Sequence, residues 1–175
     1  PACRSPLCEV QGRFVTARLK KARHLVRRFF GHVFARPLSP AEQGFVDRSL
    51  SRACADLFWL QSDADQRHAF TTAARVAARL PNDQEAIEAA LLHDIGKWRP
   101  YIGPVSRSIA TILDLARLPM TNDMRAYRDH GPLGAMQLEA ARCGRLAIEF
   151  ARHHSTEEID GSDAERWKVL YEADS

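Results

Sequence analysis

Long apolar runs are missing from this chain of 175 residues. No run approaches the roughly 18 residues that a membrane-spanning helix requires, and no segment has the composition of a secretory signal. Cysteine is scarce, and no two cysteines have the Cys-x-x-Cys spacing of a metal-binding motif. We therefore expect no transmembrane segment, and we expect free thiols in the reducing environment of the cytoplasm. The cysteines are Cys3, Cys8, Cys54 and Cys143.

The alternation of polar and apolar residues that is typical of β-strands is also missing. There is neither an internal repeat nor a low-complexity segment. The chain is 45% hydrophobic and 27% charged, which suits a compact domain with one sizeable core. Its apolar residues recur at helical spacing almost throughout. The fold class predicted from this pattern is all-α.

Polar residues that start helices divide the chain into segments. Ser39-Pro40-Ala41-Glu42 has the pattern of a capping box with proline at the first helical position. It predicts a helix that continues to about residue 60. Ser62 is expected to cap the next helix, and Asn82, with Glu85 three residues later, is expected to cap the one after it.

Proline, glycine and serine are concentrated in residues 98–106, which predicts a loop. Because Pro119 would end a further helix, we expect the rim of a pocket between about residues 98 and 129. Periodic apolar residues predict more helices elsewhere. These helices are expected over residues 14–34, 132–142, 145–154 and 163–173.

Charge is divided unevenly along the chain. Residues 1–60 carry 11 Lys/Arg and 4 Asp/Glu, a net +7, whereas residues 61–175 carry 14 and 18, a net −4. The first expected helix therefore has a basic face beside an apolar stripe, and it could bind nucleic acid, an anionic membrane surface or a polyphosphate. We favour packing of the stripe, either on the rest of the chain or in a homodimer. Residues 1–60 are thus expected to form a basic N-terminal extension that packs on a domain of residues 61–175.

His93 and Asp94 stand side by side at the end of the apolar run Ala89-Ala90-Leu91-Leu92. Charge is normally avoided at a buried position unless something such as a metal compensates it. Such a pair alone is a weak signal, since it can be an ordinary hydrogen-bonded helix end. Four other histidines and one aspartate, however, stand in or near apolar stretches of their own. These residues are His68, His130, His153, His154 and Asp174.

The order His, His-Asp, His, His, Asp resembles that of the HD superfamily of metal-dependent phosphohydrolases. The resemblance covers about residues 62–175, and its most specific part is Ala-Leu-Leu-His-Asp-Ile-Gly-Lys at 90–97. Bacterial members that split diadenosine tetraphosphate have a similar His-x-x-x-Gly-Ala segment, here at 130–135, and a similar Ala-Asp ending. The cyclic-dinucleotide phosphodiesterases with a Gly-Tyr-Pro signature are similar at 153–154, but Ser162-Asp163 stands where that signature belongs. The resemblance implies an HD-domain helical bundle, and the two helices predicted before residue 61 would form an N-terminal extension to it.

The same residues have a direct chemical meaning. Neutral imidazoles and carboxylates suit Fe, Mn, Zn, Co or Ni ions, and one carboxylate can bridge two of them. We expect two divalent transition metals, iron or manganese first, with Mg as a further alternative and Asp94 as the bridge. Residues 153 and 154 point about 100° apart on a helix, so they need not both reach one metal. The expected ligands are His68, His93 and Asp174 for the first metal, and His130 with His153, His154 or both for the second.

Cations near the His-Asp pair are candidates for binding a phosphorylated substrate. Lys97 follows Asp94 by about one helical turn, so its ammonium could reach a phosphate oxygen at the metals. A solvated lysine at a helix C-terminus is the plainer interpretation. Arg67 and Arg75 are weaker candidates, and a solvated helix face explains Arg75 equally well. Asp94 and Lys97 are the expected catalytic residues, with Lys97, Arg67 and Arg75 as substrate contacts.

Two metals could clamp a phosphoryl group and activate a water molecule to attack it, without a protein nucleophile. The sequence therefore predicts a phosphomonoesterase or phosphodiesterase that acts on a nucleotide or another small phosphoester. Some HD-superfamily members, such as inositol oxygenase, use a similar ligand set to hold a mixed-valent di-iron centre, so an oxygenase is the alternative. A non-catalytic HD signalling module is a further alternative. We disfavour it because none of the expected ligands is missing from the sequence.

Overall fold

The structure is a computed structural model that describes residues 36–98, 106, 110, 113, 118–154, 156–157, 159 and 161–174. Within these residues every regular element is a helix and none is a strand, which confirms the predicted all-α class. The helix expected over 14–34 and much of the rim expected between 98 and 129 lie outside them. The elements are α2 (Pro40–Ser49), α3 (Arg52–Trp59), α4 (Asp63–Arg79), α5 (Gln84–Leu92), the 3₁₀ helix η1 (Ile95–Trp98), α7 (Asn122–Arg128), α8 (His130–Ala140), α9 (Arg145–His153) and α10 (Ala164–Asp174).

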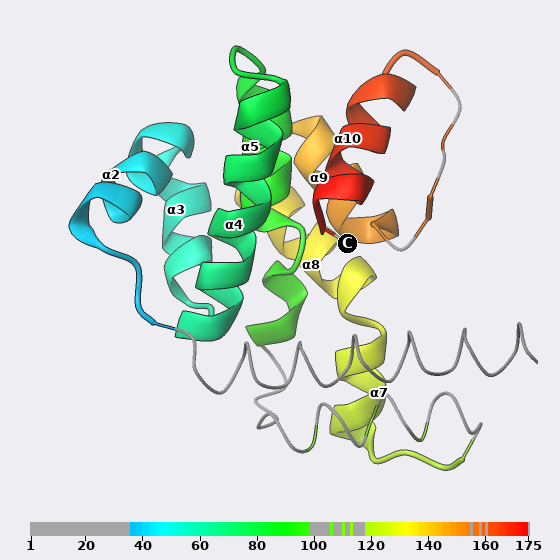
Figure 1. Ribbon diagram of the computed structural model, residues 1–175. Coiled ribbons are helices and arrows are strands. Elements are labelled where there is room, and N and C mark those ends of the chain that lie inside the picture. The colour runs from blue at the N-terminus through cyan, green and yellow to red at the C-terminus, as the bar shows by residue number, and fades with distance from the viewer. Residues whose placement is uncertain are drawn as a thin grey trace, which may run out of the picture.

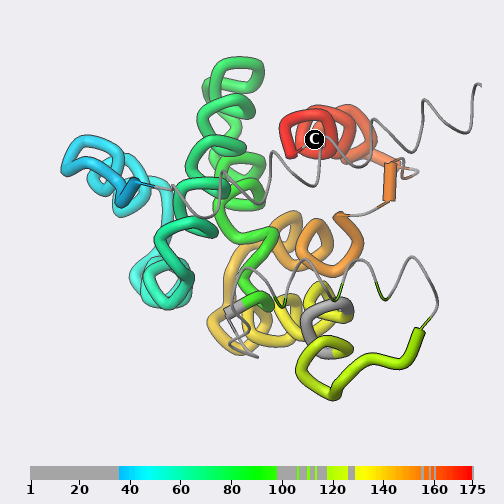
Figure 2. The backbone as a smooth tube through the Cα atoms, turned by 60° about the horizontal axis from the view of Figure 1, so that its bottom comes forward, coloured from blue at the N-terminus to red at the C-terminus, as the bar shows by residue number. Residues whose placement is uncertain are grey.

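The antiparallel helices α4 and α5 form the centre of the bundle (Figure 1). α5 contacts α2 and α3 on one side and α9 and α10 on the other. α8 packs along α9 and against η1, and α10 lies on α4 (Figure 2). None of the helices in the described part of the chain combines the length and apolar character that a membrane-spanning helix requires. One core joins all of these elements except α7, and its largest buried side chains include Phe58, Leu91, Leu138, Phe150 and Trp167.

Short polar side chains start several helices near the predicted positions. Ser39 begins α2 with the predicted capping box, in which its N–H donates to the glutamate three residues later at 2.6 Å. Ser62 begins α4 by accepting from a backbone N–H at 3.3 Å. The prediction of Asn82 as a cap is wrong, because Asp83 begins α5 and accepts from a backbone N–H at 3.0 Å. Aspartate caps as well as asparagine does, and its charge also suits a helix N-terminus.

The single helix predicted from residue 40 to about 60 is wrong, since the chain forms α2 and α3 there. The backbone becomes extended at Leu50, whose side chain is buried in the core. Ser51 then caps α3 by accepting from the Cys54 N–H at 3.4 Å. Later in the chain, α8 begins at His130, two residues before the predicted start. Pro132 falls within the first turn of α8, where its missing N–H removes no helical hydrogen bond.

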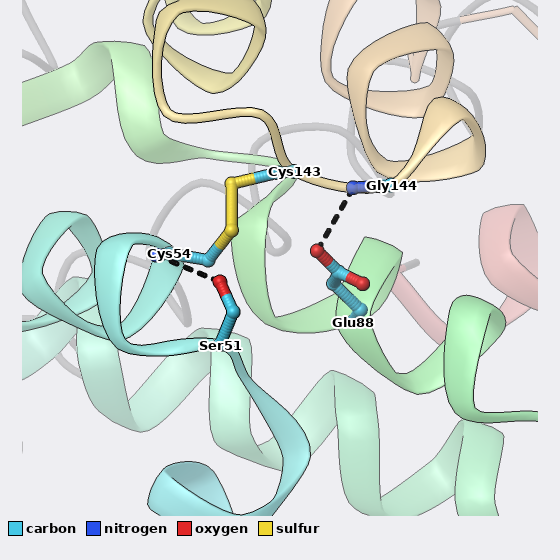
Figure 3. Close-up of a disulfide and its surroundings, with 5 residues drawn as sticks. All are labelled: Ser51, Cys54, Glu88, Cys143 and Gly144. Carbon is cyan, nitrogen blue, oxygen red and sulfur yellow. Dashed lines mark hydrogen bonds between the residues drawn. A yellow bond between two sulfur atoms is a disulfide. The ribbon is translucent and has the colours of Figure 1, made fainter.

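The prediction of free thiols is wrong for Cys54 and Cys143, which form a disulfide (Figure 3). Cys54 belongs to α3, and Cys143 lies in the turn between α8 and α9. They are 89 residues apart in the sequence, and only the packing of distant helices brings them together. The cysteines therefore no longer favour a reducing compartment. Cys3 and Cys8 lie outside the described residues.

Hydrogen bonds fix α10 against the central pair of helices at both of its ends. Near the first end, Arg166 donates to Asp83 at 2.6 Å, and this hydrogen bond lowers the pKa of Asp83. Near the second end, Arg75 donates to the Ala173 carbonyl at 2.8 Å. The next residue is Asp174, so these contacts hold a predicted metal ligand in place.

Candidate metal centre

The carboxylate of Asp94 lies at the centre of a buried cluster of histidines. Asp94 follows α5 closely and is 1% exposed. Its Oδ2 atom lies 3.4 Å from Nε2 of His93 and 3.8 Å from Nε2 of His68. Its Oδ1 atom lies 3.3 Å from Nε2 of His130 and 3.8 Å from Nε2 of His154. The two oxygens therefore face two different pairs of imidazoles, which we call the first and the second group.

Asp174 adds a second carboxylate to the first group from the end of α10. Its Oδ1 atom lies 2.8 Å from Nε2 of His68 and 3.1 Å from Nε2 of His93. Within each group the possible ligand atoms of Asp94 and its two histidines all lie within 4.8 Å of one another. Such spacing allows each group to surround one metal ion.

Backbone hydrogen bonds turn the rings of two of these histidines toward Asp94. Nδ1 of His93 donates to the Ala90 carbonyl at 2.9 Å, and Nδ1 of His154 donates to the Ala151 carbonyl at 3.1 Å. Because a carbonyl can only accept, Nδ1 carries the proton and Nε2 remains for a ligand. The contributions to the cluster are His68 from α4, His93 and Asp94 from the end of α5, His130 from the start of α8, His154 from the end of α9 and Asp174 from the end of α10.

The residues present fit a transition-metal ion. Nε2 of His93 and Oδ1 of Asp94 are buried and make no hydrogen bond of good geometry with any described residue. A buried polar atom without such a bond is costly, and a cation can satisfy both atoms. Four imidazoles and two carboxylates suit Fe, Mn, Zn, Co or Ni better than they suit Ca or Mg, which prefer oxygen ligands.

The electrostatics of the cluster favour positive charge in the first group. Burial opposes an imidazolium at His93, but the carboxylates of Asp94 and Asp174 outweigh burial and raise the pKa of His93 to about 10. Burial also opposes ionisation of Asp94, yet the cations of Lys97 and His93 hold its pKa well below the usual range. In the second group, burial lowers the pKa of His154 to about 4, so this imidazole is neutral at pH 7. A metal in the first group must therefore displace a proton, whereas His154 is already in its metal-binding form.

Of the adjacent histidines 153 and 154, the structure brings only His154 to Asp94. His153 is the last residue of α9 and is exposed. The side chain of His154 is 15% exposed, and its ring centroid lies 5.1 Å from that of His130. The sequence left this choice open because it does not show which residue faces α8 where α9 ends.

This placement predicts that metal binding weakens in one of two neighbouring variants and stays unchanged in the other. His154→Ala should weaken the binding of one metal by about 100-fold, because it removes an imidazole from the second group. His153→Ala should leave both affinities within about twofold, as expected for an exposed residue. Isothermal titration of the metal-free protein with Mn²⁺ measures both affinities. A loss in His153→Ala as large as that in His154→Ala would show that the placement is wrong.

The cations predicted to bind substrate have different surroundings. Lys97 is 5% exposed, and its ammonium forms an ion pair with Oδ2 of Asp94. Arg67 instead pairs with Glu42 in the first turn of α2 at 3.0 Å and donates to a backbone carbonyl at 2.8 Å. Arg75 holds the end of α10, as described above. The structure thus brings Lys97 into the cluster, while Arg67 and Arg75 hold neighbouring segments in place.

Glycines allow the second group to approach Asp94, and sequence reasoning missed them. A Cβ atom at Gly96 would lie 2.0 Å from the His130 carbonyl oxygen and 2.8 Å from the Gly134 nitrogen. A Cβ atom at Gly131 would lie 2.9 Å from two carbonyl oxygens near the end of α9. Backbone therefore packs directly on backbone where η1, α8 and α9 meet. The sequence held a signal for these glycines, because each of them stands close in sequence to a predicted metal ligand.

The side chains of the cluster differ in their exposure to solvent. The side chains of His68 and Asp174 are 35% and 24% exposed, whereas that of Asp94 is 2% exposed. The side chains of His130 and His154 are each 15% exposed. Of the side chains in the cluster, those of His68 and Asp174 are therefore the most accessible.

Comparison of the chain with protein-family models, with curated proteins and with solved structures finds no match. Membership of the HD superfamily therefore stays a prediction from the motifs in the sequence. What the cluster can do follows from the chemistry and the positions of its own residues.

Proposed function

We propose that this chain is a metal-dependent phosphohydrolase that uses two transition-metal ions to cleave a nucleotide or another small phosphoester. The observation that carries the proposal is the position of Asp94, whose two oxygens face separate pairs of imidazoles. A carboxylate in such surroundings is suited to bridge two cations. The first ion would be held by His68, His93, Asp94 and Asp174, and the second by Asp94, His130 and His154.

Two bound metals supply Lewis acidity for a phosphoryl group and an activated water at neutral pH. The residues of the chain prepare the site for this chemistry. Burial of His93 and Asp94 keeps bulk water away and strengthens the electrostatic interactions around them. The hydrogen bonds from Nδ1 of His93 and His154 hold both rings in a ligating orientation. The more exposed side chains of His68 and Asp174 leave a side from which a substrate can enter.

The position of Lys97 supports the proposal that the substrate is phosphorylated. Its ammonium forms an ion pair with Asp94 and is buried in the cluster. A lysine ammonium has three donors on a flexible stem, so it can contact a carboxylate and a phosphate oxygen together. This cation would offset the charge that develops on the phosphoryl group during cleavage.

The direct test offers the Mn²⁺- or Fe²⁺-loaded protein a panel of phosphomonoesters, phosphodiesters, nucleotides and dinucleoside polyphosphates. We expect release of phosphate or nucleotide. Lys97→Gln should lower kcat/KM by about 100-fold while the metal content is retained, because it removes a donor to the reacting phosphoryl group. Lys168→Gln is the matched control, since Lys168 is exposed on α10. Its activity should equal that of the unmodified chain.

Three outcomes would contradict parts of this proposal. A protein that holds two metals and cleaves no phosphoester in the panel is not a phosphohydrolase for this class of substrate. Iron-dependent consumption of O₂ by that protein, with no turnover on Mn²⁺, would instead identify the oxygenase alternative. Equal activity of Lys97→Gln and Lys168→Gln would show that Lys97 has no role in the reaction.

A further inference from the structure

The hairpin of α8 and α9 carries the two histidines of the second group at its open end. His130 begins α8 and His154 follows α9, so the closed end at residues 141–144 lies at the far end of both helices. A contact that fixes residues 141–144 therefore also helps to fix the positions of His130 and His154. Cys143 lies in this closed end and is bonded to Cys54 of α3 (Figure 3).

The backbone of the closed end is unfavourable by itself. Arg142 has a φ of 57°, in the left-handed region that L-residues other than glycine adopt at a cost. The N–H of Cys143 donates to the Leu138 carbonyl at 3.0 Å, as in helix ends that usually carry glycine at the position of Arg142. Contacts to other helices hold this turn. Two of these contacts are the disulfide and the hydrogen bond from the Gly144 N–H to Glu88 of α5, at 3.0 Å (Figure 3).

The disulfide is the covalent one of these two contacts, and both of its cysteines belong to the buried core. Cys54 is 0% exposed and Cys143 is 8% exposed. Cys143 is the more exposed of the two, so we expect a reductant to attack its sulfur. α3 and α9 both pack on α5, so cleavage of the bond removes the covalent link between α3 and the hairpin and leaves their packing on α5.

We propose that Cys54 and Cys143 form a reversible thiol–disulfide site whose oxidised state holds His130 and His154 in position to bind the second metal. This inference depends on the two-metal centre of the proposed function. The first group takes His68, His93 and Asp174 from α4, α5 and α10, which lie outside the hairpin. Reduction should therefore weaken the second metal selectively.

A small dithiol can act as the reductant. One of its thiolates attacks Sγ of Cys143, the S–S bond breaks, and Cys54 leaves as a thiolate that takes up a proton. The second thiol of the reductant then attacks the mixed disulfide and releases Cys143 as a thiol. Two cysteine thiols and one cyclic disulfide result, so two electrons pass from the dithiol to the protein. A small-molecule disulfide reverses the exchange.

The test uses the full chain in its oxidised form and after treatment with dithiothreitol, which is removed under nitrogen before Mn²⁺ is added. Alkylation and peptide mass mapping should find Cys54 and Cys143 blocked before reduction and modified after it. Titration with Mn²⁺ should then show that the second site binds at least about tenfold more weakly in the reduced protein than in the oxidised protein, with the first site unchanged. Amide hydrogen exchange over residues 141–154 should be faster after reduction, and this readout needs no metal.

Variants separate the disulfide from other effects of reduction. The double variant Cys54→Ser/Cys143→Ser should bind Mn²⁺ like the reduced protein and should not respond to dithiothreitol. The double variant Cys3→Ser/Cys8→Ser should keep the full response. If the first variant fails to fold, the comparison of the oxidised and the reduced unmodified protein still tests whether the disulfide controls binding of the second metal.

Each unexpected result has a distinct meaning. If each of the two Mn²⁺ sites has the same affinity in the oxidised and in the reduced protein, the redox inference is overturned and the proposed function stays intact. An oxidised protein that binds no metal would overturn both. An additional metal bound only by the reduced protein would assign the thiolates to a metal site with Glu88, whose ligand atom lies within 4.8 Å of both sulfurs, and would overturn the inference.

Discussion

Asp94→Asn should lose both of the metals that we propose and, with them, the proposed phosphohydrolase activity. The amide keeps the shape of the carboxylate but carries no charge, and one of its two polar atoms is a donor. It therefore cannot bridge two cations. The metal content after loading should fall from about two ions per chain to well below one, and turnover should fall on the order of a thousandfold or more. Mass spectrometry of the metals after desalting, together with phosphate release, measures both effects.

Two further variants show whether this loss is specific. Asp56→Asn changes an exposed aspartate of α3 and should keep both metals. Asp174→Asn removes a carboxylate from the first group alone, so it should weaken one metal and leave the other bound. Because Asp94→Asn takes away the ion-pair partner of Lys97, circular dichroism must confirm that this variant folds. A folded Asp94→Asn protein with normal metal content would refute the two-metal centre.

Gly96→Ala is expected to damage the site although it changes no ligand. The added Cβ would lie 2.0 Å from the carbonyl oxygen of His130, which is backbone and can move only if α8 moves. Overpacking of this kind should lower the free energy of unfolding by about 3 kcal/mol. It should also shift His130 away from Asp94 and so weaken the second metal more than the first. Urea denaturation and Mn²⁺ titration of the same preparation measure the two effects.

Gly44→Ala is the matched control for this experiment. A Cβ at Gly44 would meet only the end of the flexible Arg48 side chain, at 3.1 Å. Since Gly44 lies inside α2, alanine there should leave the stability unchanged or raise it by up to about 1 kcal/mol. Metal binding should not change. Unchanged stability and two normal metal sites in Gly96→Ala would mean that α8 does not pack on η1 as closely as the structure shows.

Local rules were sufficient for much of the helical framework. The capping box at Ser39 and the cap at Ser62 depend on residues within one turn, and both lie at the predicted positions. The break between α2 and α3 was missed because it depends on the burial of Leu50 in a core built by distant helices. The error between Asn82 and Asp83 is of another kind, because the two adjacent residues are about equally good caps.

The candidate site could be predicted in its chemistry more readily than in its geometry. His93 and Asp94 are conspicuous because these polar residues end an apolar run, a signal that the six adjacent residues 89–94 already contain. The choice of His154 over His153 depends on how α9 meets α8. The partner of Arg67 lies 25 residues away in the sequence, and the disulfide joins residues 89 apart. Contacts between residues so far apart in the sequence leave no trace in a local sequence pattern. The bound metals and the reaction stay predictions.

The donors of the cluster meet only in the folded chain, and this links folding to metal supply. His68 and Asp174 are 106 residues apart in the sequence, yet their side chains lie 2.8 Å apart. An unfolded chain cannot match the affinity of the native cluster. Each bound ion therefore stabilises the native state by an amount that grows with the logarithm of the free metal concentration. Where metal is scarce, a larger fraction of the chains would be unfolded and open to proteolysis, so the cell's metal content would also set how much of this protein persists.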